Sequence, residues 1–451
     1  MSWLRRNGAV AVPLVLSLSA LLWVYDLALR PGFGFSILVI AALSFALVLW
    51  RLGNACVPSS VVLAGAVLLR LLALPLVPSL SNDIYRYLWD GKVTLAGFNP
   101  YLLAPDAEEL SSLRDSVWQQ VSHRQVETVY PPVALGLFSI ATLLPSPLLA
   151  LKCMLTAIDI LSCLLLIRLV RARGDPLGRC IGYAWNPLVV VEVAGMGHVD
   201  ALGVAPLLAG ALLLEGARAM PKGRLAARSA SAGALLALAV LSKLVPLLLL
   251  PAWARRAPKR LFMLMVCALV LIVAILPFLP TVRGVPPGLV TYGVSWEFNG
   301  PVFEPLWRVL DALSLDRWIK SGLGQLESLT GLDEVLSPLY PFVYPQLLAK
   351  MLLVAGLLGV VVVSSRRDDI VAAAFLVFAG LIVFSATVYP WYLIWVLPWA
   401  AALGRWPWLV LSSVAFSSYL PQFLGIPLMP WPYLMMWMPL VVALVVERRT
   451  D

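Results

Sequence analysis

Apolar stretches recur along the whole chain, and they constrain its fold more than any other feature. A helix needs about 20 residues to cross the hydrocarbon core of a bilayer. Hydrophobic residues make up 61% of the 451 residues and charged residues only 13%, whereas soluble domains carry roughly 25% charged residues. Backbone groups in lipid must be bonded within the chain, and the alternation typical of a membrane β-barrel is absent. The sequence therefore predicts an all-α, polytopic transmembrane helical bundle.

Short basic clusters between the apolar stretches predict the topology. Lysine and arginine concentrate in cytoplasmic loops, and placing the clusters there gives about 14 crossings with both termini cytoplasmic. The predicted helices include residues 9–29 and 35–50 at the start of the chain and residues 180–195 further on. Two long outer loops remain: residues 81–146, with a membrane-dipping helix at 131–146, and residues 281–344. The stretch 229–253 has basic loops on both sides, so we expect two short helices that meet at Lys243. The chain is expected to form a single domain, residues 1–451.

The composition also argues against two other classes of site. The net charge of +9 does not indicate a nucleic-acid binder, because the basic residues lie in the loops between apolar stretches. The five cysteines lie in or beside apolar segments, without CxxC or His/Cys metal spacing. We therefore expect no nucleic-acid partner and no structural metal.

The predicted topology places the polar residues that interrupt apolar segments at the outer ends of helices. Ionisable groups at membrane depth are costly and usually mark function. The set comprises Asp83, Tyr130, His198, Asp200, Lys243, Tyr389 and Tyr392. Their placement at one side of the membrane predicts a single cavity.

Asp83 follows an apolar run that ends just before it. A carboxylate beside an apolar wall can have a raised pKa and act as a general base. It can equally be a solvated loop carboxylate or the N-cap of the next helix. Arg86 and Asp90 follow at three and seven residues, so they can share a helix face with Asp83.

The segment "GMGHVD" interrupts an apolar stretch with His198 and Asp200. Glycine allows a tight turn or close approach to a ligand, but a helical hairpin capped by Asp200 explains the pattern as well. Lys243 has apolar neighbours for a full turn on either side. Snorkelling would explain it, whereas a lysine at a helix break is well placed to bind a phosphate.

The second outer loop begins with "YGVSWEFNGPVFEPLW", which includes Trp296, Glu297 and Asn299. Aromatic rings beside amides and carboxylates suit sugar binding, because rings stack on C–H faces while polar groups bond hydroxyls. An amphipathic helix at the membrane interface fits the same pattern. The tyrosine of "YPP", Tyr130, is expected to face the cavity beside a helix that starts at the prolines.

Taken together, the motifs resemble a known family, the membrane-embedded GT-C glycosyltransferases, and most closely their bacterial polyprenyl-phosphate-mannose-type branch. The motifs are "SNDIYRYLWDGKV…GFNPY" at 81–101, "YPP" at 130–132, "WNP…GHVD" at 185–200, "SKLVP" at 242–246 and "YPWYL" at 389–393. The resemblance implies transfer of a mannose-like hexose from a polyprenyl-phosphate donor to an extracytoplasmic lipid or glycan acceptor, with inversion. It also implies a multi-pass protein of the bacterial inner (plasma) membrane, in contact with membrane lipids.

The resemblance implies roles for individual residues. Asp83 corresponds to the catalytic base, and Asp200 corresponds to the acidic position of the second outer loop in that family. His198 stands where relatives with diphosphate-linked donors carry a second acid, so no cofactor and no divalent metal are expected. The candidates for binding the donor phosphate are Lys243, Arg86 and His198. The candidates for substrate binding are Asp200, Tyr130, Asp90, Trp296, Glu297, Asn299, Tyr389 and Tyr392.

Two other functions would use a polytopic chain with polar groups at one side. A lipid-linked glycan transporter or flippase would place its site near the bilayer midplane between inverted repeats, and no repeat is evident here. A glycan polymerase or ligase would favour arginine-rich outer sites over a leading carboxylate such as Asp83.

Overall fold

The computed structural model describes residues 57–215, 221–278 and 284–450. Within these ranges the only extended pairing is a set of isolated bridges from Phe298 and Asn299 to Thr387. Every other regular element is helical, which confirms the all-α prediction for the described chain. The first two predicted helices, residues 9–29 and 35–50, lie outside the described residues.

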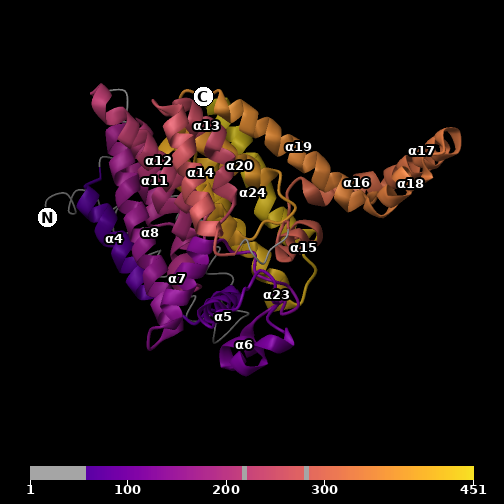
Figure 1. Cartoon of the computed structure of the whole chain (residues 1–451). Coiled ribbons are helices and arrows are strands. Elements are labelled where there is room, and N and C mark those ends of the chain that lie inside the picture. Colours follow the sequence, from indigo (N-terminus) through magenta and orange to yellow (C-terminus); the bar gives the residue numbers. More distant parts are fainter. Residues whose placement is uncertain (1–56, 216–220, 279–283, 451) are drawn as a thin grey trace.

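One group of helices packs side by side in the bundle (Figure 1). These are α4 (Ser59–Ala73), α8 (Pro147–Ala172), α11 (Ala201–Glu215), α12 (Leu225–Val240) and α14 (Arg260–Ile275). Helix α12 packs between α11 and α14, and α11 packs on α8. A Cβ atom at Gly233 would lie 2.2 Å from the carbonyl oxygen of Met263, so glycine is what permits α12 and α14 to approach so closely.

The C-terminal part of the chain supplies a second group of helices. These are α19 (Pro345–Ser365), α20 (Ile370–Val383), α21 (Leu397–Leu403), α22 (Trp406–Val414) and α24 (Trp431–Thr450). Helix α20 contacts both α19 and α21, and α24 contacts α22. Short segments complete these groups: η3 (Leu177–Cys180), α9 (Ile181–Ala184), α10 (Pro187–Val189), η4 (Val190–Gly195), η6 (Lys222–Arg224), η7 (Val245–Leu249), α13 (Leu250–Arg256), η9 (Pro390–Trp395), η10 (Ala415–Tyr419) and α23 (Leu420–Leu424).

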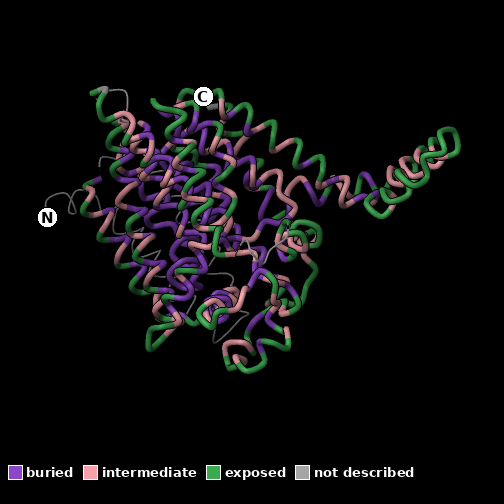
Figure 2. Tube along the Cα trace, viewed as in Figure 1, coloured by how far each residue is buried: buried purple, intermediate pink, exposed green. Residues whose placement is uncertain are grey.

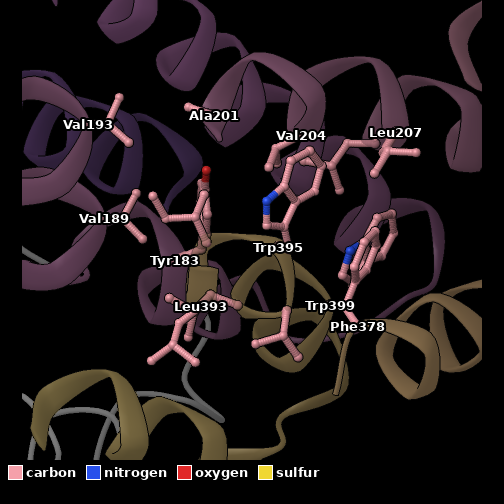
Figure 3. Close-up of a cluster of buried hydrophobic side chains, with 14 of the residues drawn as sticks. Tyr183, Val189, Val193, Ala201, Val204, Leu207, Phe378, Leu393, Trp395 and Trp399 are labelled. Carbon is pink, nitrogen blue, oxygen red and sulfur yellow. The ribbon is translucent and has the colours of Figure 1, made fainter. Parts of the chain in front are cut away.

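The core lies where the two groups meet, and the buried part of the chain runs through the centre of the bundle (Figure 2). Figure 3 shows Trp395 and Trp399 beside Phe378, facing apolar side chains of α11 such as Val204. A Cβ atom at Gly203 would lie 2.4 Å from the ring of Trp395. The tryptophan therefore fills the space that the glycine leaves, and this contact fixes the C-terminal half against α11.

Three described helices are long and apolar enough to cross a membrane: Pro147–Ala172, Arg260–Phe278 and Pro345–Ser365. Five shorter apolar helices accompany them. Helix α14 leaves most of its apolar side chains exposed, for example Leu269 and Ile272. Burial of such a face against lipid would be favourable, so the chain is a membrane protein that is all-helical over its described residues. The predicted total of about 14 crossings is not established by these helices.

Several shorter helices gather at one end of the bundle (Figure 1). They are α5 (Asp83–Leu95), η2 (Glu108–Leu113), α6 (Ser116–Gln120), α7 (Pro132–Thr142) and α15 (Pro287–Ser295). An arm projects from the side of the bundle and consists of α16 (Phe303–Ala312), α17 (Leu315–Thr330), α18 (Asp333–Leu336) and η8 (Ser337–Phe342). The arm leads directly into α19. These elements make up most of the two predicted outer loops.

Two local predictions can be compared directly with the structure. The helix break predicted at Lys243 is present, because α12 ends at Val240 and the chain becomes helical again only at Val245. The single helix predicted over residues 180–195 is instead broken. Proline 187 has no N–H to continue the preceding helix, and the side chain of Asn186 accepts a hydrogen bond from the N–H of Leu188, which starts a new helix there.

Candidate functional site

The turn that carries His198 and Asp200 packs against the segment that leads into α5. Gly197 has a φ of +80°, a conformation that glycine adopts without strain. A Cβ atom at this position would lie 2.5 Å from Cδ1 of Ile84. The neighbouring Met196 accepts a hydrogen bond through its sulfur from the backbone N–H of Leu80, at 3.4 Å. These contacts hold the 195–200 turn beside Asp83, the first residue of α5.

The start of α7 packs against the break in the chain before Lys243. The backbone N–H groups of Val133 and Ala134 donate to the carbonyl oxygen of Leu241, at 3.0 and 3.3 Å. The first N–H groups of a helix have no partner within it, so this carbonyl satisfies them. The "YPP" and "SKLVP" motifs are thereby brought together, although more than a hundred residues separate them.

Lys243 forms an ion pair with Asp200. Its Nζ lies 2.6 Å from Oδ1 of Asp200 and 4.3 Å from the ring centroid of Tyr392. The indole Nε1–H of Trp395 donates to the same carboxylate oxygen at 2.6 Å. Asp200 is completely buried, whereas the side chain of Lys243 is 23% exposed. The lysine is therefore a paired cation with a side chain that is still partly exposed.

Arg86 forms an ion pair with Asp90, four residues further along α5. The guanidinium Nε donates to Oδ1 of Asp90 at 2.8 Å, and the Thr128 hydroxyl donates to Oδ2 at 2.6 Å. Burial raises the pKa of Asp90, while Arg86 and Thr128 favour its ionised form. Both oxygens of Asp90 are thus engaged in holding Arg86 and the segment before Tyr130.

Asp83 differs from the other two carboxylates in its surroundings. Asp83 is partly exposed, and its backbone N–H donates to the Ser81 hydroxyl at 3.2 Å. No side chain in the part of the chain that the structure describes bonds or pairs with its carboxylate group. Asp83 therefore has a carboxylate that is accessible and uncommitted.

A group of tyrosines connects Asp83 to Asp200. The rings of Tyr87 and Tyr130 meet edge to face at 4.9 Å. Burial raises the pKa of Tyr87, and the negative charges of Asp83 and Asp200 act in the same direction. Burial likewise raises the pKa of Tyr292 to about 12, again with contributions from both aspartates. The two carboxylates thus act on the same tyrosines, which indicates that both lie within electrostatic range of this group.

His198 is buried in a network that the motifs did not reveal. Its Nδ1 lies 3.0 Å from Oε2 of Glu192, which is also completely buried. Its ring stacks on Trp391, with centroids 4.0 Å apart and planes 12° apart. The hydroxyl of Tyr419 donates to the other oxygen of Glu192 at 2.8 Å. A carboxylate within an apolar run, as in "VVVEVAG", was the sequence signal that could have identified Glu192.

Of the three candidates from the second outer loop, only Trp296 contacts the tyrosine group described above. The ring of Trp296 lies 5.5 Å from that of Tyr292, at the edge of the tyrosine group. Glu297 pairs with Lys350 at 2.9 Å. Asn299 is buried, and its amide donates to the sulfur of Met436 at 2.9 Å. Trp296 therefore remains the best placed of the three to contact a ligand.

Two further candidates come from the "YPWYL" segment. Tyr389 stacks on Trp391, with ring centroids 4.5 Å apart, and on Phe298 at 4.6 Å. The hydroxyl groups of Tyr392 and Tyr292 share a hydrogen bond. The segment thus links the Lys243–Asp200 pair to the stack around His198.

The described residues contain no group of three or more His, Cys, Asp or Glu side chains that could hold a metal ion. The site offers instead one accessible carboxylate, three cationic or potentially cationic side chains and a wall of aromatic rings. Such an arrangement can accept a proton at Asp83 and can stabilise an anion at Lys243, Arg86 or His198.

A comparison with protein families gives one match. The model described as "Alpha-(1->6)-mannopyranosyltransferase, N-terminal domain" matches residues 7–257, which is more than half of the chain. No curated protein and no solved structure matches the chain. The matched range includes the accessible carboxylate, the histidine turn and the Lys243–Asp200 pair.

Proposed function

Because the chain belongs to the alpha-(1->6)-mannopyranosyltransferase family, we propose that it transfers a mannose-like hexose from a polyprenyl-phosphate donor to a lipid or glycan acceptor. The family supports the mannose transfer. The lipid-linked donor is our proposal, and so is assignment to the GT-C superfamily. The observation that carries the chemistry is the uncommitted carboxylate of Asp83, which acts on the same tyrosines as the paired Asp200.

The proposed reaction is a displacement at the anomeric carbon of the donor sugar. Asp83 accepts the proton of the acceptor hydroxyl while the hydroxyl oxygen forms a bond to the anomeric carbon. The bond between that carbon and the phosphate oxygen breaks, and its electron pair stays on the departing polyprenyl phosphate. Because attack comes from the face opposite the leaving group, the configuration at the anomeric carbon is inverted.

The departing phosphate requires positive charge or hydrogen-bond donors. Lys243 is the leading candidate, because an ammonium group has three N–H donors and only one of them is needed for Asp200. Arg86 is held on α5 by Asp90. His198 belongs to the turn that packs against Ile84, next to Asp83. These three side chains come from three separate segments of the chain.

The proposed setting is the outer face of a bacterial inner membrane. The exposed apolar faces of helices such as α14 and α19 support a position in lipid. The polyprenyl chain of the donor would lie between helices and bring its phosphate to the interface. We also propose that the chain crosses the membrane about 14 times and that its site lies on the extracytoplasmic side.

The proposal is tested by supplying the purified protein with polyprenyl-phosphate mannose and, in parallel, with a nucleotide-linked mannose. We expect a mannosylated product, identified by mass spectrometry, from the lipid-linked donor alone. The Asp83→Asn variant, prepared in the same way, is the control for contaminating enzymes. Transfer from the nucleotide donor but not from the lipid-linked donor would show that the proposed donor class is wrong.

A further inference from the structure

A completely buried carboxylate lies behind the candidate phosphate-binding histidine. Glu192 belongs to η4, a π-helical segment, and none of its surface is exposed. Buried ionisable residues are expensive in membrane proteins and usually have a function. Short π-helical segments frequently occur at functional sites. The reaction proposed above gives Glu192 no role, so its position requires an explanation.

Two contacts fix the imidazole ring of His198 in orientation. Stacking on Trp391 at 4.0 Å sets the plane of the ring. Nδ1 lies 3.0 Å from Oε2 of Glu192, an ion-pair contact without hydrogen-bond geometry, and this contact favours the observed rotation within that plane. Trp391 is held in turn by Tyr389, whose ring lies 4.5 Å away and almost parallel to it. The ring is therefore constrained in both degrees of freedom, with Nε2 on the side away from Glu192.

Both nitrogens of His198 are buried and neither forms a hydrogen bond with the residues described. Nδ1 has the Glu192 carboxylate at 3.0 Å as an ion-pair partner, whereas Nε2 has no polar partner among those residues. Buried polar atoms are nearly always bonded, so an exception needs a reason. The turn that carries His198 packs directly on Ile84, beside Asp83. Tyr419, the other partner of Glu192, is close enough to Asp83 for their charges to interact. The unpartnered nitrogen therefore lies in the neighbourhood of the proposed base, where the donor would bind.

We infer that Glu192 is a positioning residue that turns Nε2 of His198 toward the phosphate of the donor. This inference rests on the proposed function, because the phosphate is that of the proposed donor. A carboxylate beside one nitrogen of a histidine orients the ring and thereby directs the other nitrogen. Glu192 acts only through His198 and makes no contact with the substrate.

Binding of polyprenyl phosphate without a sugar tests the inference. The lipid is titrated against wild-type protein, Glu192→Gln, His198→Gln and the double variant in detergent. Glutamine keeps the shape of Glu192 and an acceptor for the Tyr419 hydroxyl. We expect each single variant to bind roughly tenfold more weakly. The double variant should bind no more weakly than His198→Gln, because residues that act as one unit are not additive.

The Asp159→Asn variant is a matched control. Asp159 is equally buried and pairs with Arg70, at 2.7 Å, instead of with a residue of the site. It should lower thermal stability while polyprenyl phosphate binds as in the wild type. If Glu192→Gln does not fold, Glu192→Asp replaces it, because it keeps the charge but withdraws the carboxylate from His198.

The outcomes separate the inference from the proposed function. If the Glu192 variant binds normally, or if the losses at Glu192 and His198 add, the positioning role is wrong and the proposed function stands. If the wild-type protein does not bind polyprenyl phosphate at all, the proposed donor is wrong and the inference fails with it. Non-additive losses at Glu192 and His198 together with normal binding by Asp159→Asn support the inference.

Discussion

The ammonium group of Lys243 lies 2.6 Å from Oδ1 of Asp200, which is completely buried. Loss of one member of a buried ion pair leaves the other charge uncompensated, at a cost of about 3–5 kcal/mol. Because Lys243 is 23% exposed, we expect the lower end of that range. The pair therefore contributes to stability as well as to the charge of the site.

Lys243→Met should abolish mannose transfer, weaken donor binding and lower the melting temperature. Adding Asp200→Asn should restore most of the stability, because it removes the buried charge, but it should not restore transfer. Lys243→Arg should rescue poorly, since a planar guanidinium differs from a compact ammonium group. Thermal unfolding and donor titration measure the two effects separately. Normal donor affinity in a folded Lys243→Met variant would contradict a phosphate-binding role.

Because Asp90 pairs with Arg86, we expect a substitution of Asp90 to affect stability more than catalysis. Both oxygens of Asp90 are bonded, to Arg86 and to Thr128. Asp90→Asn should therefore lower the melting temperature, with a milder effect on turnover than a change at Asp83. Turnover per folded molecule, determined after size-exclusion chromatography, makes the comparison. A folded Asp90→Asn variant with no activity would mean that Asp90 has a direct part in catalysis.

The predicted topology can be tested by chemical labelling in intact cells. Cysteines introduced at Ser112 and Gln325, which are exposed in the structure, should react with an impermeant thiol reagent from outside in a cysteine-free background. A cysteine at position 222 should not react. Labelling at 222 would place the basic loop outside and would move His198 to the cytoplasmic side.

The arm formed by α16–η8 predicts contact with the membrane surface. In α17 the side chains of Trp318, Leu326 and Leu329 are exposed. An α-helix turns by about 100° per residue, so the three side chains fall within about 80° of one another around the helix axis and form one face. The arm leads into α19, a helix long enough to span the membrane. In lipid nanodiscs, a spin label at Trp318 should therefore be accessible to oxygen, which concentrates in lipid. A spin label at Lys320, which lies on another face of α17, should be accessible to a polar reagent. Equal access of both labels to the polar reagent would show that the arm is in water.

Much of the fold was predictable because apolar length and proline placement act locally. The helix that begins at "YPP" and the break at Lys243 both follow from such signals. The interruption at Asn186 was missed because apolar composition hides a proline that stops the helix. The local sequence pattern thus indicated which segments are helical, but it was a poorer guide to the positions at which a helix is interrupted.

The sequence indicated residues that could form a site, but it did not indicate how they would pair. The sequence indicated that Asp200 and Lys243 lie at the same side, but not that they form an ion pair. Glu192 was not among the predicted site residues. One of its partners, His198, is six residues away, and the other, Tyr419, is more than two hundred residues away. The burial of Asn299 against Met436 depends on the packing of α24, which no local pattern encodes.

The central claim is that Asp83 is the base that accepts the proton of the acceptor hydroxyl. Its carboxylate has no side-chain partner among the residues described, and α5 places it beside the His198 turn. A base must lie within about 3 Å of the proton that it accepts, and the proposed topology puts Asp83 near the interface, where the apolar segment before it ends.

Turnover by the Asp83→Asn variant at saturating donor tests this claim most directly, with donor binding measured on the same preparation. The amide keeps the shape of the side chain and removes the base, so donor should bind normally while turnover falls by about 10² or more. Near wild-type turnover in Asp83→Asn, together with a large loss in Asp90→Asn, would contradict the account and identify the other carboxylate as the base.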